Sequence, residues 1–294
     1  MEGADAVSKG AAMTQGASSR YTERVVKESG STFAWSFGSL SRKQRRGMMA
    51  LYAFCRVVDD IVDEAWEPLI KEKQLLFWRN QIQIAAGGTS QHPLTIELGF
   101  LIQNFGVTEE ELTTLLDGVA ADCQPVTPRT RADLERYCYG VASIVGIMCL
   151  RIFGVSQTAA ARHAATQLGY AFQCTNILRD VTTDAATGRC YFPSQELVEF
   201  NLTPETLLDS THHSDAVAFL EKQCDQTWGY FNAAWAEFPK SDSAKLYPAR
   251  IMSTYYEAIL KKIAQDPAAV LKAPVKLGLF RKIGLLLWAG LKRS

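Results

Sequence analysis

Apolar side chains recur every three or four residues along almost the whole 294-residue chain, which is the spacing of one face of an α-helix. No stretch shows the alternation and tight turn of a β-hairpin, and no internal repeat is visible. No linker is long enough to divide the chain. We therefore predict an all-α protein with a single helical domain. The expected helices are 21–29, 41–65, 69–86, 92–105, 108–121, 129–154, 156–185, 214–236, 249–265 and 275–291, with a further short helix starting at Thr203-Pro204.

The two ends of the chain differ in composition from the part between them. Residues 1–20 are rich in Gly, Ala and Ser and lack the apolar core of a signal peptide, so we expect a flexible tail before a helical domain over 21–270. Residues 271–294 are basic and apolar together, and their longest uncharged run, 283–291, is too short to span a bilayer. This amphipathic segment either packs onto the domain as a final helix or lies in the membrane interface.

Composition excludes several classes of protein. Lys plus Arg number 31, as do Asp plus Glu, so the chain lacks the basic surplus of a nucleic-acid-binding protein. The seven cysteines form no C-x-x-C pair and lie mostly among apolar residues, which favours free thiols in a reducing compartment. No uninterrupted apolar run reaches the roughly 18 to 20 residues of a membrane span. We expect a cytoplasmic protein.

The segment 51–64 places acidic side chains on one face of an otherwise apolar helix. At about 100° per residue, its polar residues fall within roughly one third of the circumference. They are Arg56, Asp59, Asp60 and Asp63. Buried carboxylates need a partner, because unpaired buried charge is costly. Taken alone, the segment is equally consistent with a solvated stripe that contains an Arg56–Asp60 pair.

A second segment carries a longer polar stripe. Its members are three, four and four residues apart and lie within about 80° of one another, over roughly 16 Å of helix. They are Gln173, Asn176, Asp180 and Asp184. Four aligned acceptor groups on a core helix each need a partner. Two such helices facing each other would surround a cavity with four or five carboxylates.

Carboxylates gathered around one cavity repel one another unless cations lie between them. Mg²⁺ suits such a site, because this hard ion takes carboxylate oxygens and completes its shell with water and substrate phosphates. The four histidines lie away from both segments and offer no zinc site. No P-loop or G-x-G-x-x-G motif is present to hold phosphates in a glycine-rich loop.

Both segments resemble the aspartate motifs of the squalene/phytoene synthase family, the head-to-head branch of the trans-prenyl synthases. They read Asp59-Asp-Ile-Val-Asp63 and Asp180-Val-Thr-Thr-Asp184, and the second lies inside the larger signature Gln173-x-x-Asn176-x-x-Arg179-Asp180. The similarity covers about residues 25–265. It includes the substrate flap at 31–37, the central helix at 137–146 and the loop at 188–193, with one departure at Ala142-Ser143, where the family usually has Ala-Gly. The resemblance implies the isoprenoid-synthase helical bundle with a central cavity.

The resemblance also implies roles for individual residues. Two or three Mg²⁺ ions would be held by the motif aspartates Asp59, Asp63, Asp180 and Asp184. The diphosphates and metal-bound water would be contacted by Arg56, Arg189, Gln173 and Asn176. Tyr137 matches a family tyrosine near the reacting carbons, and Phe33 and Phe37 would help to close the cavity. The alternative for Arg56 is a structural ion pair, and for the two phenylalanines it is an ordinary place in the core.

Within the family, residues 145–154 and the basic tail are most similar to bacterial enzymes that make presqualene diphosphate from two farnesyl diphosphates, for squalene and hopanoid synthesis. This similarity implies that NADPH is not used, that a separate squalene-forming enzyme acts downstream, and that the protein lies in the cytoplasm or peripherally at the inner face of the membrane. Four alternatives stay open. They are phytoene synthesis from geranylgeranyl diphosphate, complete NADPH-dependent squalene or dehydrosqualene synthesis, a terpene cyclase, and a non-catalytic assembly factor that retains the fold.

Overall fold

The computed structural model describes residues 15–29, 37, 40–88, 90–124 and 127–277, and this part of the chain contains no β-strand. The longer helices are α1 (Gln15–Glu28), α2 (Arg42–Asp63), α3 (Pro68–Gly87), α4 (Pro93–Phe105), α5 (Glu109–Ala120), α6 (Arg131–Cys138), α7 (Ile144–Phe153), α8 (Ala159–Arg179), α11 (His213–Glu237) and α12 (Tyr247–Gln265). The short ones are η2 (Ala121–Cys123), η3 (Tyr139–Ser143), α9 (Val181–Ala186), α10 (Ser194–Val198), η4 (Ser210–His212), η5 (Lys240–Asp242) and η6 (Pro267–Leu271). The prediction of an all-α fold is confirmed.

Local sequence signals mark most helix ends. Ser41, Thr108 and Thr130 close capping boxes at the starts of α2, α5 and α6. Pro68 and Pro93 occupy the first positions of α3 and α4, where the missing N–H would have no helical partner. A left-handed glycine follows each of α3, α4 and α7. The ends of α2, α3, α4 and α5 therefore agree with the expected ends to within two residues.

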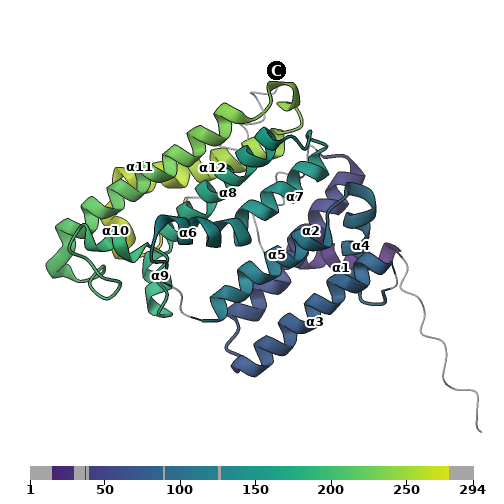
Figure 1. Cartoon of the computed structure of the whole chain (residues 1–294), viewed down its shortest axis with the longest axis horizontal. Coiled ribbons are helices and arrows are strands. Elements are labelled where there is room, and N and C mark those ends of the chain that lie inside the picture. The colour runs from purple at the N-terminus through teal and green to yellow at the C-terminus, as the bar shows by residue number, and fades with distance from the viewer. Residues whose placement is uncertain (1–14, 30–36, 38–39, 89, 125–126, 278–294) are drawn as a thin grey trace, which may run out of the picture.

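The helices pack in two groups that meet along α5 (Figure 1). In one group α11, α12 and α7 pack against α8, and in the other α1, α2 and α3 pack against α4. Helix α5 contacts α2 and α3 on one side and the π-helical segment η3 on the other. Buried apolar side chains from both groups form one continuous core. The described residues therefore make a single domain, as predicted.

Close backbone contacts hold η3 between α5 and α8. A Cβ on Gly118 of α5 would lie 2.5 Å from the carbonyl carbon of Gly140, and a Cβ on Gly169 of α8 would lie 2.4 Å from Ser143 Cα. No other residue type fits at 118 or 169 without moving the backbone. Ser143 donates from Oγ to the carbonyl of Thr166 at 2.8 Å. The serine is accommodated here because residue 169 has no side chain.

The N-terminal and C-terminal boundaries differ from those expected. Helix α1 begins at Gln15, so residues 15–20 of the expected flexible tail are helical. The reason is burial: Ser18 is fully buried and donates to the buried carboxylate of Glu97 at 2.5 Å. At the other end Val275 and Leu277 are also buried, so the packed body continues past residue 270. The rest of the basic segment, 278–294, lies outside the described residues.

Two expected helices also differ in their interior, and a third is not formed. The helix expected over 129–154 contains the π-helical turn η3, and the one expected over 156–185 is broken at Asp180 between α8 and α9. The prediction of a short helix starting at Thr203 was wrong, because residues 204–208 form turns. A short helix, α10, lies earlier in the chain instead.

Within the described residues, one helical stretch, Arg131–Phe153, is long and apolar enough to cross a membrane by length and composition. It carries charged residues near both ends, and 56% of its most apolar window is buried inside the protein. Such burial is typical of a core helix. All seven cysteines are free thiols, as the sequence predicted.

Candidate active site

The first aspartate motif lies at the C-terminal end of α2. Part of the Asp59 side chain is exposed to solvent, but many protein atoms lie around the carboxyl group and limit its hydration. This burial and the charge of Asp63 raise the pKa of Asp59 to about 7, against the opposing effect of Arg56. Asp63, one turn further on, exposes 60% of its side chain. Arg56 pairs with Asp60 on the same helix, which is the structural alternative for Arg56.

The second aspartate motif lies where α8 ends and α9 begins. Asp180 forms the joint, with φ −105° and ψ 16°, and its carboxylate makes a bidentate pair with Arg179. The backbone N–H of Asp184 donates to the carbonyl of Asp180 at 2.9 Å, which keeps the two aspartates one turn apart. Burial and the charge of Asp180 raise the pKa of Asp184 to about 7, and Arg189 opposes this rise.

The two amides of the second signature lie on α8 just before these aspartates. Asn176 donates through Nδ2 to Gln173 Oε1 at 3.3 Å. Asn176 Oδ1 is buried, and no described residue donates to it. A buried acceptor without a donor costs free energy. This oxygen is therefore available to a ligand.

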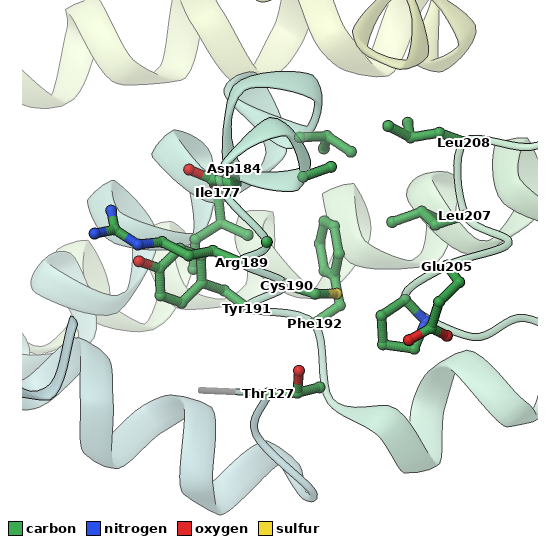
Figure 2. Close-up of a pocket in the computed structure, with 14 residues that line it drawn as sticks. Thr127, Ile177, Asp184, Arg189, Cys190, Tyr191, Phe192, Glu205, Leu207 and Leu208 are labelled. Atoms are coloured by element: carbon green, nitrogen blue, oxygen red, sulfur yellow. The ribbon is translucent and has the colours of Figure 1, made fainter. Parts of the chain in front are cut away.

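The loop after α9 connects the two motifs. Arg189 Nη1 lies 3.9 Å from the carboxylate of Asp63, and Arg189 Nη2 donates to the backbone carbonyl of Asp122 at 3.2 Å. Figure 2 shows Arg189 and Tyr191 on one side of this loop and Cys190 on the other, which is the alternation of an extended segment. The loop from the second motif thus brings a guanidinium group to the first motif.

Tyr137 on α6 belongs to a small hydrogen-bonded cluster next to this loop. Its hydroxyl donates to Asp122 Oδ2 at 2.8 Å, and the hydroxyl of Tyr191 donates to Asp122 Oδ1 at 2.8 Å. The two rings stack with centroids 5.0 Å apart and planes at 21°. Burial and the charge of Asp122 raise the pKa of Tyr137, so this phenol stays neutral.

Asp122 and Tyr191 were not among the site residues predicted from the sequence. Tyr191 lies within 188–193, a stretch that resembles a family loop, so a signal for it was present. Asp122 follows α5 in a stretch without any motif. Only the fold brings it to Tyr137 and Tyr191, and no local pattern predicts that contact.

An apolar pocket continues the polar face of α8 in the N-terminal direction. The pocket residues of α8 precede the polar stripe on the same face. They are Ala165, Leu168, Gly169 and Phe172. Helices α7 and α12 supply further walls, among them Cys149 and Met252, and no lining residue is charged. One face of α8 thus presents apolar surface first and then oxygen acceptors.

The two phenylalanines expected to close the cavity have different outcomes. Phe37 is only 2% exposed and belongs to the main core, which was the alternative for it. It is not among the residues that line the apolar pocket. Phe33 lies outside the described residues, so its predicted role stays a prediction.

The donor atoms of the two motifs suit a hard divalent cation. They are oxygens of carboxylates and of Asn176, the ligand type that Mg²⁺ prefers. Surrounding protein atoms and a neighbouring aspartate raise the pKa of Asp59 and of Asp184, and a cation between the motifs would oppose this rise by favouring the charged carboxylates. No three described His, Cys, Asp or Glu side chains already converge as a complete metal site. Water or a bound diphosphate would have to complete the coordination.

Comparisons with known proteins identify the family. The squalene/phytoene synthase family model matches residues 26–281. Presqualene diphosphate synthase of Rhodopseudomonas palustris is 32% identical over 88% of this chain and 92% of that enzyme. Chloroplastic phytoene synthase 1 of Solanum lycopersicum is 30% identical over 81% of this chain and 59% of that one. The crystal structure of a dehydrosqualene synthase in complex with ligand matches with a TM-score of 0.82 at 25% identity, covering 95% and 98% of the two chains. The chain therefore belongs to the squalene/phytoene synthase family of prenyltransferases.

Proposed function

We propose that the protein joins two molecules of farnesyl diphosphate head to head and releases presqualene diphosphate. The observation that carries this proposal is the single face of α8, on which an apolar pocket is followed by acceptor groups. A prenyl diphosphate has the same two parts, an apolar chain and an anionic end. The Rhodopseudomonas palustris relative, 32% identical over most of both chains, is named for this product.

The roles proposed for the charged residues rest on the family resemblance and are supported by their positions. Asp59, Asp63, Asp180 and Asp184 would hold two or three Mg²⁺ ions, which neutralise the leaving diphosphate when bound. Arg189, next to Asp63, would bind diphosphate oxygens, since a guanidinium matches their geometry.

The neutral residues would protect the reacting carbons. The apolar pocket keeps water from the allylic cation that forms when the C1–O bond breaks. Asn176 and Gln173 would orient the diphosphate end or its bound water. Tyr137 would lie near the cation, which a ring face stabilises.

The product of the reaction tests the proposal. We expect farnesyl diphosphate and Mg²⁺ to give presqualene diphosphate, and added NADPH to leave the product unchanged, because residues 145–154 resemble those of bacterial enzymes that release this product. Chromatography with mass spectrometry, with and without NADPH, makes the measurement. Squalene formed in proportion to NADPH would contradict the stopping point. A forty-carbon product from geranylgeranyl diphosphate, at higher kcat/KM than from farnesyl diphosphate, would contradict the substrate.

We also propose that the protein binds peripherally to the cytoplasmic face of a membrane, where its product meets a separate squalene-forming enzyme. Six of the eight exposed large apolar side chains among the described residues lie close together in the chain. They are Trp66, Leu69, Ile70, Leu76, Phe77 and Ile84, here named the α3 apolar face. This face begins three residues after Asp63, beside the first aspartate motif. A bilayer suits it, because prenyl chains partition into lipid at about 0.8 kcal/mol per CH₂.

Charged residues on the α3 apolar face should release the protein from lipid. We expect Leu76→Asp/Phe77→Asp to bind vesicles of phosphatidylcholine and phosphatidylglycerol at least about tenfold more weakly, because two apolar side chains no longer enter the interface. Val198→Asp is the control, since Val198 is 67% exposed on α10, outside this face. Equal vesicle co-sedimentation of all three proteins would contradict the proposal. A changed oligomeric state with unchanged vesicle binding would identify a second copy of the chain as the occupant.

A further inference from the structure

Asp122 contacts three side chains of the candidate active site but belongs to neither aspartate motif. Each of its carboxylate oxygens accepts one hydrogen bond, from Tyr137 and from Tyr191, both at 2.8 Å. Its backbone carbonyl accepts a third from Arg189 at 3.2 Å. Asp122 lies in η2, directly after α5, whereas the donors come from α6 and from the loop after α9. One residue thus joins three separate segments of the site.

The two tyrosine bonds fix where the hydroxyl protons point. A phenol has one O–H donor, and an ionised carboxylate only accepts. Because both protons are directed at Asp122, neither Tyr137 nor Tyr191 can donate to a ligand at the same time. What the stacked pair offers to a ligand is its ring faces and the remaining oxygen lone pairs.

The charge of Asp122 reaches both aspartate motifs. It contributes to the raised pKa of Asp59 on α2 and of Asp184 on α9. Burial raises the pKa of Asp122 itself, while the two tyrosine hydroxyls and Arg189 oppose that rise. The cluster of Asp122, Tyr137 and Tyr191 therefore lies within electrostatic reach of both ends of the site.

We propose that Asp122 is a positioning residue for prenyl transfer, which holds the protons of both phenols so that a bound substrate meets ring faces and lone pairs only. This inference rests on the proposed function. A developing allylic cation is stabilised by a ring face and by oxygen lone pairs, and an O–H dipole pointing at it is unfavourable. The competing view is that Asp122 only tethers the loop after α9 to α5.

Asp122→Asn separates these two views. The amide has nearly the same shape, but it offers one accepting oxygen and one donating nitrogen. It can therefore accept from only one of the two phenols, and the other must turn its proton elsewhere. We expect kcat to fall roughly tenfold, while KM for farnesyl diphosphate changes less than about twofold. We also expect a larger share of the substrate to end as farnesol, because a less stabilised cation is trapped by water more often.

A second substitution, Tyr191→Phe, separates the positioning role of Asp122 from a general loss of stability. Tyr191→Phe removes one competing hydroxyl, so the amide oxygen introduced by Asp122→Asn can accept from Tyr137 again. We expect Asp122→Asn to have a smaller effect on kcat and on the farnesol share in the Tyr191→Phe background than in the wild-type background. A tether predicts equal or larger effects in that background, because each lost contact adds to the others.

The experiment is a double-mutant cycle on the full chain with Asp122→Asn, Tyr191→Phe and their combination. Product shares, kcat and KM are measured with Mg²⁺, and binding of the unreactive analogue farnesyl thiodiphosphate is measured by calorimetry, where unchanged Kd is expected. Additive effects with an unchanged farnesol share would overturn the positioning role. A wild-type protein that forms no head-to-head product would instead overturn the proposed function, so the two failures are distinguishable.

Discussion

Replacing Asp59 by Asn is expected to lower turnover at least about a hundredfold. The amide keeps the size of the side chain but removes one anionic oxygen from the first motif. Surrounding protein atoms and the charge of Asp63 raise the pKa of Asp59 to about 7, and a bound cation would oppose this rise, so we expect the loss to fall on cation binding. Initial rates at saturating farnesyl diphosphate across a Mg²⁺ titration make the measurement.

The same substitution should leave folding intact. The pKa of Asp59 is higher in the folded chain than the usual value of about 3.9. Between roughly pH 4 and 7 the folded state therefore binds more protons than the unfolded state, and the free energy of unfolding falls as pH rises. Without metal, we expect Asp59→Asn to show a shallower fall than wild type over this range, measured by denaturant unfolding.

A matched control is available on the surface of α5. Asp117 pairs with Arg79 and exposes 54% of its side chain, so Asp117→Asn makes the same chemical change outside the site. Its turnover should stay within about twofold of wild type, since surface pairs contribute little. Near-normal activity of Asp59→Asn at low Mg²⁺ would contradict the proposal that Asp59 binds Mg²⁺.

Gly169→Ala is expected to reduce the free energy of unfolding by about 2–4 kcal/mol. The added methyl would meet Ser143 at 2.4 Å from Cα, 2.5 Å from Oγ and 2.6 Å from the backbone N. Two of these atoms are backbone, so α8 and η3 must separate, and the loss outweighs the gain in helix propensity. Thermal and denaturant unfolding make the measurement.

Gly229→Ala is the control for this prediction. Gly229 also lies inside a helix, α11, but a Cβ there meets nothing within 4 Å. Alanine should therefore stabilise the protein by about 0.5–1 kcal/mol through helix propensity. If both variants were stabilised alike, the close approach of α8 to η3 would be wrong.

Sequence patterns predicted the elements that local chemistry defines. Pro68, the capping box at Thr108 and the left-handed Gly106 end or begin helices by their own geometry. The length of the N-terminal tail was overestimated because residues 15–20 look like a tail by composition, whereas in the fold α1 packs against α2 and α4 and Ser18 donates to Glu97. Composition cannot report a contact with a residue that is distant in the chain.

In the candidate site, too, residues with a local sequence pattern were predicted and contacts between distant residues were not. Asp59, Asp63, Asp180 and Asp184 were predicted because each pair repeats at helical spacing, and the structure places each pair at the end of a helix. The break of the helix at Asp180 was not predicted, since its polar stripe keeps a regular spacing across the break. Asp122 was missed because its partners, Tyr137 and Tyr191, are distant in sequence and meet only after folding.

The π-helical turn η3 changes the direction in which the side chains of the following helix, α7, point. A π turn is closed by i→i+5 hydrogen bonds and holds about one residue more than an α turn, so α7 is rotated by about 100° relative to an uninterrupted continuation of α6. In that continuation Met148 would share the angular position of Tyr137. With the extra residue, Cys149 takes that position and lines the apolar pocket, while Met148 is fully buried. Deletion of one residue from 139–143 would rotate α7, so that side chains now in the core would face the pocket and the present pocket side chains would turn away from it. The composition of α7 would stay unchanged. Relatives of this chain should therefore tolerate substitutions along α7 far better than a change of length in this turn.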